Sequence, residues 1–350
     1  MILDSLPIAR VERQNLKLRH MHEGMRFYLA RLAIAAIVLI SCSCRRPLPA
    51  ADAFDHLRAM DNEFISLFNA IRQTKSFGIL QEIQTVENIP LPFYAHTSEN
   101  AGDVKTFNFE RHRGSYFYDT LINRFVLTHQ SDSIILHYPI RLNNSKLAKL
   151  VISDFGEEKG SGNIMIPTLF KGFLSVDGRK VAEIEHRATL QHHLPVAVDL
   201  YAKVESYEFR IILTSRLRRK LSNAVLNVRV DRDGENKING IIQSKLGFDS
   251  NGVMRFHTLR ASLSAFPVLL LARVNNDAID PHTTDFRSEF NDHSRIEAFR
   301  LNDNRKLGEI RLKQRARSDK LDYAFYNADG SYVFLEDELF MVREIMNIKK

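Results

Sequence analysis

Apolar and polar residues alternate one by one along much of the chain after about residue 104. In the clearest example, Ala182, Ile184 and Leu190 fall on one side of an extended chain, whereas Glu183 and Glu185 fall on the other. A period of two is typical of β-strands with one buried and one solvated face. It predicts strands over 182–190, 207–213, 224–230 and 238–246, and shorter runs predict others near 123–128, 133–138, 147–153, 309–313 and 321–326.

Four short pairs of turn residues separate strand-like runs. They are Asp177-Gly178, Asp233-Gly234, Asn251-Gly252 and Asp329-Gly330. Such pairs tolerate the positive φ angles that two-residue hairpins require. Because strands joined by tight hairpins run antiparallel, the chain is predicted to form an antiparallel meander rather than βαβ units.

The period changes at both ends of this β-rich region. Residues 52–74 have apolar residues at three- and four-residue steps, which predicts an amphipathic helix: Leu57, Met60, Phe64, Leu67, Phe68 and Ile71. A second short helix is expected near 76–87, and another over 336–350. The fold class is therefore predicted as α+β. It is mainly antiparallel β (a curved sheet, an open barrel or a sandwich) with an N-terminal amphipathic helix and a short C-terminal helix.

Two neighbouring segments leave alternatives open. Residues 258–274 contain an apolar run that fits either a buried strand or a short helix beginning at Pro267. Residues 275–294 have the composition of a loop, but that length is unusual within a compact domain, so an unrecognised element is expected there. No internal repeat or linker is evident, and residues 52–350 are expected to form a single β-rich domain.

A short apolar leader precedes the domain. Arg26 and Arg31 flank the start of the run Leu32 to Ile40, in which every residue is apolar. Nine helical residues rise about 13 Å, well short of the ~30 Å hydrocarbon core of a bilayer. A positive region followed by a short apolar region is typical of a secretory signal peptide.

The end of the leader resembles the lipobox of bacterial lipoprotein precursors. The residues are Leu39-Ile40-Ser41-Cys42. The resemblance implies that the Cys42 thiol carries a diacylglycerol, that a peptidase cleaves before Cys42, and that the new amine is acylated. Residues 1–41 are then an N-terminal extension plus signal peptide, with Met25 as an alternative start, and 42–51 are a lipidated tether. An uncleaved anchor or an ordinary core strand is the competing interpretation, and Cys44 fits the pattern less well.

The resemblance also implies a location. Ser43 follows the lipidated position, as in lipoproteins sent to the outer membrane, and Arg45-Arg46 lacks the acidic cluster of surface-exported Bacteroidota lipoproteins. We therefore expect a lipid-anchored protein of the cell envelope, on the outer membrane and facing the periplasm. The mature region vaguely resembles uncharacterised lipoproteins of Bacteroidota, and this resemblance assigns no functional residue.

Charge and cysteine usage agree with that location. The formal net charge is +7, and residues 1–41 hold six basic and three acidic residues, so cleavage would leave +4. This charge is too small to indicate nucleic-acid binding, but it is compatible with an anionic membrane surface. The two cysteines lie two residues apart and cannot close a useful disulfide loop.

Several residue groups contain side chains that could carry chemistry, and none of these groups has a specific signature. His137, His186 and His193 could form a metal site only through the fold, because no metal-binding spacing joins them. The segment Asp231–Glu235 resembles part of a calcium loop but lacks the acid at its twelfth position, and a hairpin turn explains it better. Glu183 and Glu185 have a spacing that glycosidases can use, yet they sit on a polar strand face.

Two further features point to binding rather than catalysis. Arg216, Arg218, Arg219 and Lys220 form the densest basic cluster, which is expected to be a solvated turn or a contact for an anionic partner. No G-x-S-x-G or P-loop pattern is present. No catalytic, cofactor-binding or metal residue is therefore assigned, and Cys42 is the only predicted site residue.

Three functional hypotheses follow. The leading one is a non-enzymatic, membrane-anchored envelope lipoprotein that binds a hydrophobic ligand or an envelope protein partner, because wide apolar faces and 23 Phe accompany the β pattern. The second is a glycan-handling accessory, for which Tyr116, Phe117 and Tyr118 would have to replace the absent Trp. The third is a hydrolase with dispersed catalytic residues.

Overall fold

The fold was analysed in a computed structural model. It describes residues 48–86, 89–91, 107–140, 146–160, 165–218, 222–248, 254–280, 283–316, 318 and 320–347. All of these belong to one compact unit, Leu48–Lys350. The signal peptide, the lipobox with Cys42, most of the tether and the Asn251-Gly252 turn lie outside the described residues, so those expectations stay predictions.

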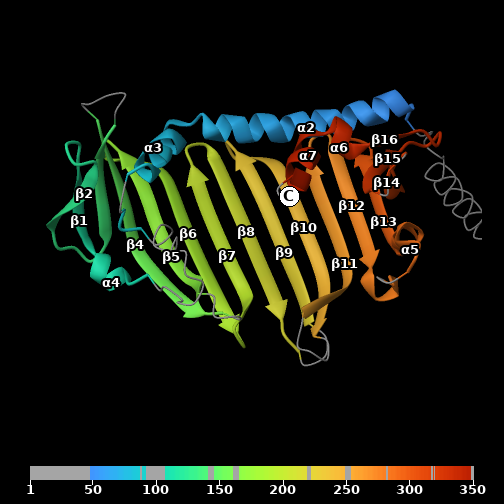
Figure 1. Ribbon diagram of the computed structural model, residues 1–350. Helices are drawn as coiled ribbons and strands as arrows, with labels where there is room; N and C mark the ends of the chain where they lie inside the picture. Colours follow the sequence, from blue (N-terminus) through green and yellow to red (C-terminus); the bar gives the residue numbers. More distant parts are fainter. Residues whose placement is uncertain are drawn as a thin grey trace, which may run out of the picture. The chain divides into compact units, whose positions relative to one another are not determined.

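One sheet of sixteen strands dominates this unit (Figure 1). Its strands are β1 Gly114–Asp119, β2 Arg124–His129, β3 Ile134–Pro139, β4 Leu147–Lys159, β5 Met165–Val176, β6 Arg179–Gln191, β7 Leu194–Val204, β8 Tyr207–Arg216, β9 Ser222–Arg232, β10 Glu235–Phe248, β11 Met254–Ala265, β12 Val268–Asn275, β13 Ser294–Arg300, β14 Lys306–Gln314, β15 Leu321–Tyr326 and β16 Tyr332–Phe334. From β3 to β16, each strand pairs with the next along the chain, and β1 lies between β3 and β2.

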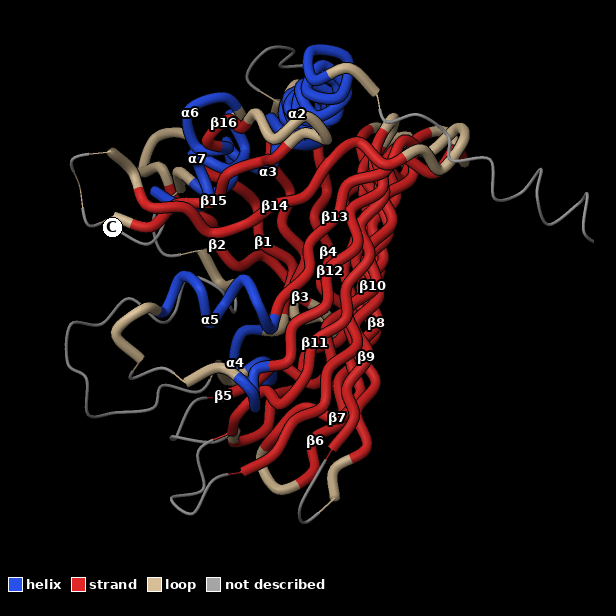
Figure 2. The backbone as a smooth tube through the Cα atoms, turned by 90° about the vertical axis from the view of Figure 1, so that its right-hand side faces the viewer, coloured by secondary structure: helices blue, strands red, loops and turns tan. Residues whose placement is uncertain are grey.

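The sheet is antiparallel except at one pair. β1 runs parallel to β3 and antiparallel to β2, while every pair from β3 to β16 is antiparallel. The two ends of the sheet bend toward the same side and do not meet (Figure 2). The predicted α+β class and the antiparallel meander are confirmed, and of the expected architectures the structure is the curved, non-closed sheet.

The helices lie at the strand ends and on the side toward which the sheet bends (Figure 2). They are α2 Ala50–Arg72, α3 Lys75–Gln84, α4 Phe109–His112, the 3₁₀ turn η2 Asn276–Ala278, α5 Phe286–His293, α6 Leu335–Glu338 and α7 Phe340–Asn347. α2 and α3 confirm the two predicted N-terminal helices, and α6 with α7 replace the single helix expected at the C-terminus. No helix within the described residues is long and apolar enough to cross a bilayer.

Two separate hydrophobic cores hold the sheet, one at each end. In the first, α2 packs its apolar stripe, including Leu57 and Met60, on Val268 and Phe325 of the C-terminal strands. In the second, α3 and the segment around Phe109 pack on β3 to β6, with Ile134 fully buried. The first core also includes Tyr207, Val230 and Ile238 at the near ends of β8, β9 and β10, so only the parts of these middle strands that are remote from α2 belong to neither core.

The two ambiguous segments are resolved by the structure. Residues 258–274 form parts of β11 and β12, joined by a turn with a cis Phe266-Pro267 peptide, so the strand alternative is correct and the helix alternative is wrong. Residues 275–294 contain η2 and α5, which are the expected unrecognised elements. The Asn291 side chain on α5 bonds the backbone N–H and C=O of Leu312, and it thereby fastens this segment to β14.

Candidate functional site

The two faces of the central strands differ in chemistry. Residues that lie opposite one another across neighbouring strands share a face of the sheet. The core that contains α2 includes one such set of residues: Tyr207, Val230, Ile238, Ala265 and Val268. We call the face that carries these residues the inner face, and the opposite one the outer face. Because α2 lies on the side toward which the sheet bends, the inner face is the concave one (Figure 2).

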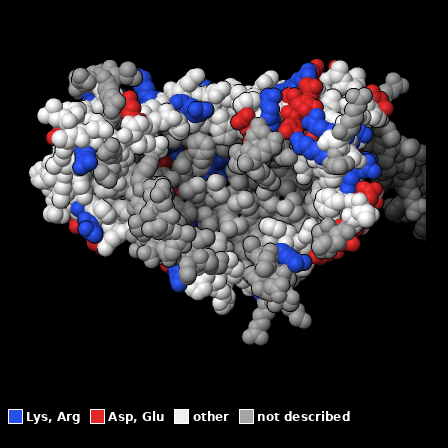
Figure 3. Space-filling view, viewed as in Figure 1, with Lys and Arg blue, Asp and Glu red and all other residues white. Residues whose placement is uncertain are grey.

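The inner face stays apolar well beyond the part that α2 covers. From β7 to β12, the inner-face positions of the described residues between Val198 and Val274 are apolar except for Ser215, Ser222 and Ser244 and for the β9–β10 hairpin end, where Arg232 lies over the Tyr207 ring. We call its part outside both cores the trough, and its members are Val198, Leu200, Ile211, Leu213, Leu226, Val228, Ile242, Leu259 and Val274. They are half-buried, and Ile242 is 37% exposed. The space-filling view shows a hollow on this side, between two thicker ends (Figure 3).

A cavity of about 260 Å³ adjoins the trough beneath α3. Its walls are almost entirely apolar: Leu80, Ile83 and Leu91 face Ile152, Phe170, Leu174, Ile184, Ala202 and Val204 of β4 to β7. Ala202 lies next to Leu200 on the same side of β7, so the cavity and the trough share a strand. An apolar cavity of this size suits an alkyl chain better than a polar metabolite.

The outer face of the same strands is charged and solvated. Glu183 pairs with Lys180 at 2.7 Å, and Glu185 pairs with Lys171 at 3.1 Å. Both carboxylates are thus occupied by lysines on an exposed surface. The interpretation of this pair as a solvated strand face fits the structure better than a glycosidase site.

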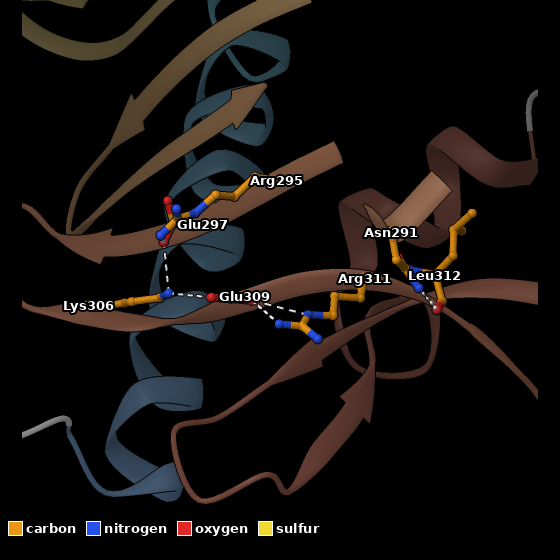
Figure 4. Close-up of polar contacts among 7 residues, drawn as sticks. All are labelled: Asn291, Arg295, Glu297, Lys306, Glu309, Arg311 and Leu312. Atoms are coloured by element: carbon orange, nitrogen blue, oxygen red, sulfur yellow. Dashed lines mark hydrogen bonds and ion pairs between the residues drawn. The ribbon is translucent and has the colours of Figure 1, made fainter. Parts of the chain in front are cut away.

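A row of alternating charges crosses the outer face between β13 and β14 (Figure 4). Glu297 accepts hydrogen bonds from Arg295 and Lys306, both at 2.8 Å, and Glu309 pairs with Lys306 and Arg311. Hydrogen bonds from Lys306 and Arg311 lower the pKa of Glu309 to about 2. Partial burial pushes the pKa of Glu297 upward, but its two hydrogen bonds outweigh burial and leave that pKa below its ordinary value.

A groove of about 700 Å³ crosses β9 to β13. Residues of both faces line it: Leu259 and Val274 belong to the trough, Arg260 and Arg273 are their outer-face neighbours, and Asp292 lies at the end of α5. The residues lie toward the strand ends that are remote from α2. A sequence pattern could not have revealed this groove, because its lining comes from five different strands.

The three candidate metal histidines do not come together. The His186 and His193 rings each lie 2.9 Å from a backbone carbonyl oxygen, of Pro167 and Lys159 respectively. His137 stacks on Phe117 with ring centroids 4.2 Å apart, and burial together with nearby Lys149 lowers its pKa. No group of three His, Cys, Asp or Glu within the described residues is placed to hold a metal ion.

The calcium-loop segment is a hairpin turn between β9 and β10. Asp233 and Gly234 take positive φ angles of 53° and 79°, as a two-residue turn requires. The Asp231 carboxylate accepts hydrogen bonds from Arg229 and Asn236 rather than facing an open ligand position. The turn prediction is therefore confirmed. Of the basic cluster, Arg216 is the last residue of β8 and Arg218 follows that strand, whereas Arg219 and Lys220 lie outside the described residues.

The proposed aromatic platform for glycans does not form as a unit. Tyr116 and Tyr118 pack against the N-terminal core, whereas Phe117 points to the other face and is 43% exposed. The Tyr116 and Tyr118 hydroxyls donate to the backbone oxygen of His112 and to Asn123. A single exposed ring remains, which gives the glycan hypothesis little support.

A complete hydrolytic triad is also missing from the described residues. His257 and Asp277 form a close pair, with 2.6 Å between Nδ1 and Oδ1. None of the hydrogen bonds among described residues joins His257 to a serine, threonine or cysteine.

Comparisons with protein-family models, curated proteins and solved structures found no match for this chain. What its surfaces bind must follow from their own chemistry.

Proposed function

We propose that this protein is a lipid-anchored lipoprotein of the cell envelope that binds a hydrophobic ligand non-enzymatically. The ligand occupies the trough and the cavity beneath α3. The observation that carries the proposal is the trough on the inner face of β7 to β12, where aliphatic side chains follow one another across the strands and are only half-buried. Soluble proteins rarely leave such a continuous apolar surface without a partner.

An alkyl chain is the ligand that this surface fits best. Each methylene group transferred from water to an apolar site contributes about 0.8 kcal/mol. A chain that lies along the trough and enters the cavity needs no polar contact on the inner face. A bound alkyl chain would also cover Ile242 and its neighbours, whose exposure to water is unfavourable.

The anchor part of the proposal rests on the lipobox and not on the fold. Acyl chains on Cys42 would hold the protein to a membrane, and the outer membrane facing the periplasm remains the expected location. The short tether to Leu48 keeps α2 close to that membrane, because a residue spans at most about 3.5 Å. A hydrophobic ligand could then exchange between bilayer and trough over a short distance.

Native mass spectrometry tests the binding function directly. The full chain carrying Cys42→Ala is purified in mild detergent, exchanged into volatile buffer and incubated with palmitate. We expect one or two saturable adducts and the same adducts with dodecanol, because the alkyl chain supplies the affinity. A protein that takes up neither palmitate nor dodecanol would refute the proposal. In that case the envelope protein partner, which the same apolar face could accept, would become the better hypothesis.

A further inference from the structure

The groove of about 700 Å³ continues the trough toward the strand ends that are remote from α2. Its inner-face lining forms one row across β9 to β13, in which each residue lies directly opposite the next: Ala224, Ser244, Leu259, Val274 and Ser294. The neighbouring row on the side of α2 is wholly aliphatic: Leu226, Ile242, Ala261, Ala272 and Ile296. Hydroxyl groups therefore enter the inner face where the groove begins.

The end of α5 adds polar groups to the groove from the concave side of the sheet (Figure 2). Asp292 and His293 of this helix line the groove next to Ser294, the first residue of β13. The His293 ring lies 3.6 Å from the Glu289 carboxylate. Asp292 is exposed, and its side chain forms no hydrogen bond or ion pair with another described residue. Its carboxylate is therefore free to accept hydrogen bonds from a ligand.

Two serines of this row keep hydrogen-bonding capacity that the protein does not use. Ser244 is 8% exposed, and its hydroxyl donates to the backbone oxygen of Thr258 at 3.1 Å, which leaves its oxygen able to accept. Ser215 continues the row onto β8, opposite Ala224. Its Oγ atom is buried and has no hydrogen-bond partner among the described residues. A ligand hydroxyl that reaches the β8 end of the row would satisfy this otherwise unfavourable group.

The charges around the groove favour an uncharged ligand group. Lys245, Arg260 and Arg273 occupy the alternate positions of their strands, so their side chains point to the outer face. The inner-face row itself contains no charged residue, and Asp292 would repel an anion. Hydroxyl groups, which both donate and accept, suit serines and a carboxylate better than a phosphate or a second carboxylate does.

We propose that the ligand of the trough is a glycolipid whose uncharged sugar head lies in this groove. Ser244 and Ser294 are three strands apart, so polar groups are spread over about 14 Å of the row, a length that suits a disaccharide better than a single hydroxyl. The groove is also large enough for such a head. Sugar hydroxyls would bind the serines and Asp292, and the C–H faces of the rings would rest on Leu259 and Val274.

This inference rests on the proposed function, because the alkyl chain of the same molecule would lie in the trough. The two trough residues in the groove lining, Leu259 and Val274, join the two parts of the site. A head bound in the groove would direct the attached chain toward Ile242 in the next row and onward across the sheet. The ligand thus receives a defined orientation, with its polar end at α5 and its apolar end toward α3.

Displacement of a dansyl-labelled fatty acid tests the inference in the full chain carrying Cys42→Ala. Dodecyl maltoside and dodecanol have the same alkyl chain, and dodecyl maltoside adds an uncharged disaccharide. Below its micelle-forming concentration, dodecyl maltoside should bind at least about tenfold more tightly than dodecanol, because two additional hydrogen bonds together are worth such a factor. Dodecyl phosphate should bind no more tightly than dodecanol, and tighter binding of this anion would contradict an uncharged head.

A pair of double variants locates the sugar. Asp292→Ala/Ser294→Ala should reduce the affinity for dodecyl maltoside to about that of dodecanol and leave dodecanol binding unchanged, which also shows that the variant is folded. The matched control, Asp199→Ala/Ser262→Ala, makes the same two changes on the outer face and should alter neither affinity. Equal affinities for dodecyl maltoside and dodecanol, or equal weakening in both double variants, would overturn the inference and leave hydrophobic binding intact. If neither compound displaces the fatty acid, the inference is wrong together with the proposed function.

Discussion

Filling the cavity beneath α3 tests the hydrophobic site most sharply. Ala202 lines this cavity on the inner face of β7. Replacement by Leu adds three carbons to the wall and displaces a similar part of any bound alkyl chain. At about 0.8 kcal/mol per methylene, the ligand would lose about 2.4 kcal/mol, which corresponds to roughly 50-fold weaker binding.

The same strand supplies a control for this variant. Ala197 lies on the outer face of β7, opposite Thr189 and Thr214 of the flanking strands. Ala197→Leu adds the identical side chain to solvent-facing surface, so affinity should not change. Fluorescence titration with a dansyl-labelled fatty acid, followed by displacement with palmitate, measures both variants against the parent chain.

The outcomes separate a ligand site from an imperfectly packed core. Ala202→Leu should leave the free energy of unfolding unchanged or slightly higher, because it fills empty apolar space. Weaker binding together with unchanged stability supports the cavity as a ligand site. If Ala202→Leu binds the fatty acid as tightly as the parent chain, or if Ala197→Leu weakens binding equally, the cavity does not hold the ligand.

Three further predictions concern the fold, its charges and the anchor. Asp61 is 6% exposed, and its carboxylate accepts hydrogen bonds from the backbone N–H groups of Phe340 and Met341. Asp61→Ala should therefore lower the free energy of unfolding, measured in urea, by about 2–4 kcal/mol. A loss below about 1 kcal/mol would contradict this role. Glu309 has a pKa lowered from 4.5 to about 2, so its ion pairs stabilise the protein above pH 4.5 and lose this contribution as pH falls toward 2. The stability difference between the parent chain and Glu309→Gln should therefore shrink over that interval, and a constant difference would refute the assignment. Cys42→Ala should abolish metabolic labelling with palmitate, while continued labelling would move the lipidation site to Cys44.

Sequence patterns predicted the strands whose two faces differ most. β6, β8, β9 and β10 alternate clearly because one face contacts core or trough and the other carries charges. The predictions did not extend to β5 and β7, where apolar residues occupy both faces. Leu169 of β5, for example, is 37% exposed, and Phe173 packs under Lys180 instead of entering the core.

Turns without glycine were equally hard to predict. Glu205, His192 and His193 take positive φ angles without a glycine, asparagine or aspartate to signal the turn. Their strands are held by long ladders on both sides, so tertiary pairing overrides local preference. The Asp-Gly turns, by contrast, carry their conformation in their own sequence.

Neither candidate site could be located from the sequence alone. The alternation shows that an apolar face exists, but not which part of it α2 leaves uncovered. That depends on the curvature of the sheet and on the path of α2, which are properties of the whole fold. Likewise, only the register of β9 to β13 places Ala224, Ser244 and Ser294 in one row.

An open trough in the middle of the sheet is compatible with a stable protein because the two cores lie at its ends. The core around Val268 and Phe325 and the core around Ile134 bury their own side chains, and only the near ends of the central strands are covered by them. A packing defect would be expected to interrupt the apolar pattern locally or to carry polar substitutions that reduce exposure. Instead, the inner face keeps large aliphatic residues such as Leu200, Ile211 and Leu226 on successive strands, while the outer face of the same strands is charged. A half-buried aliphatic surface that continues across several strands is what a binding face for an apolar ligand would require, and this continuity is the reason for the proposed function.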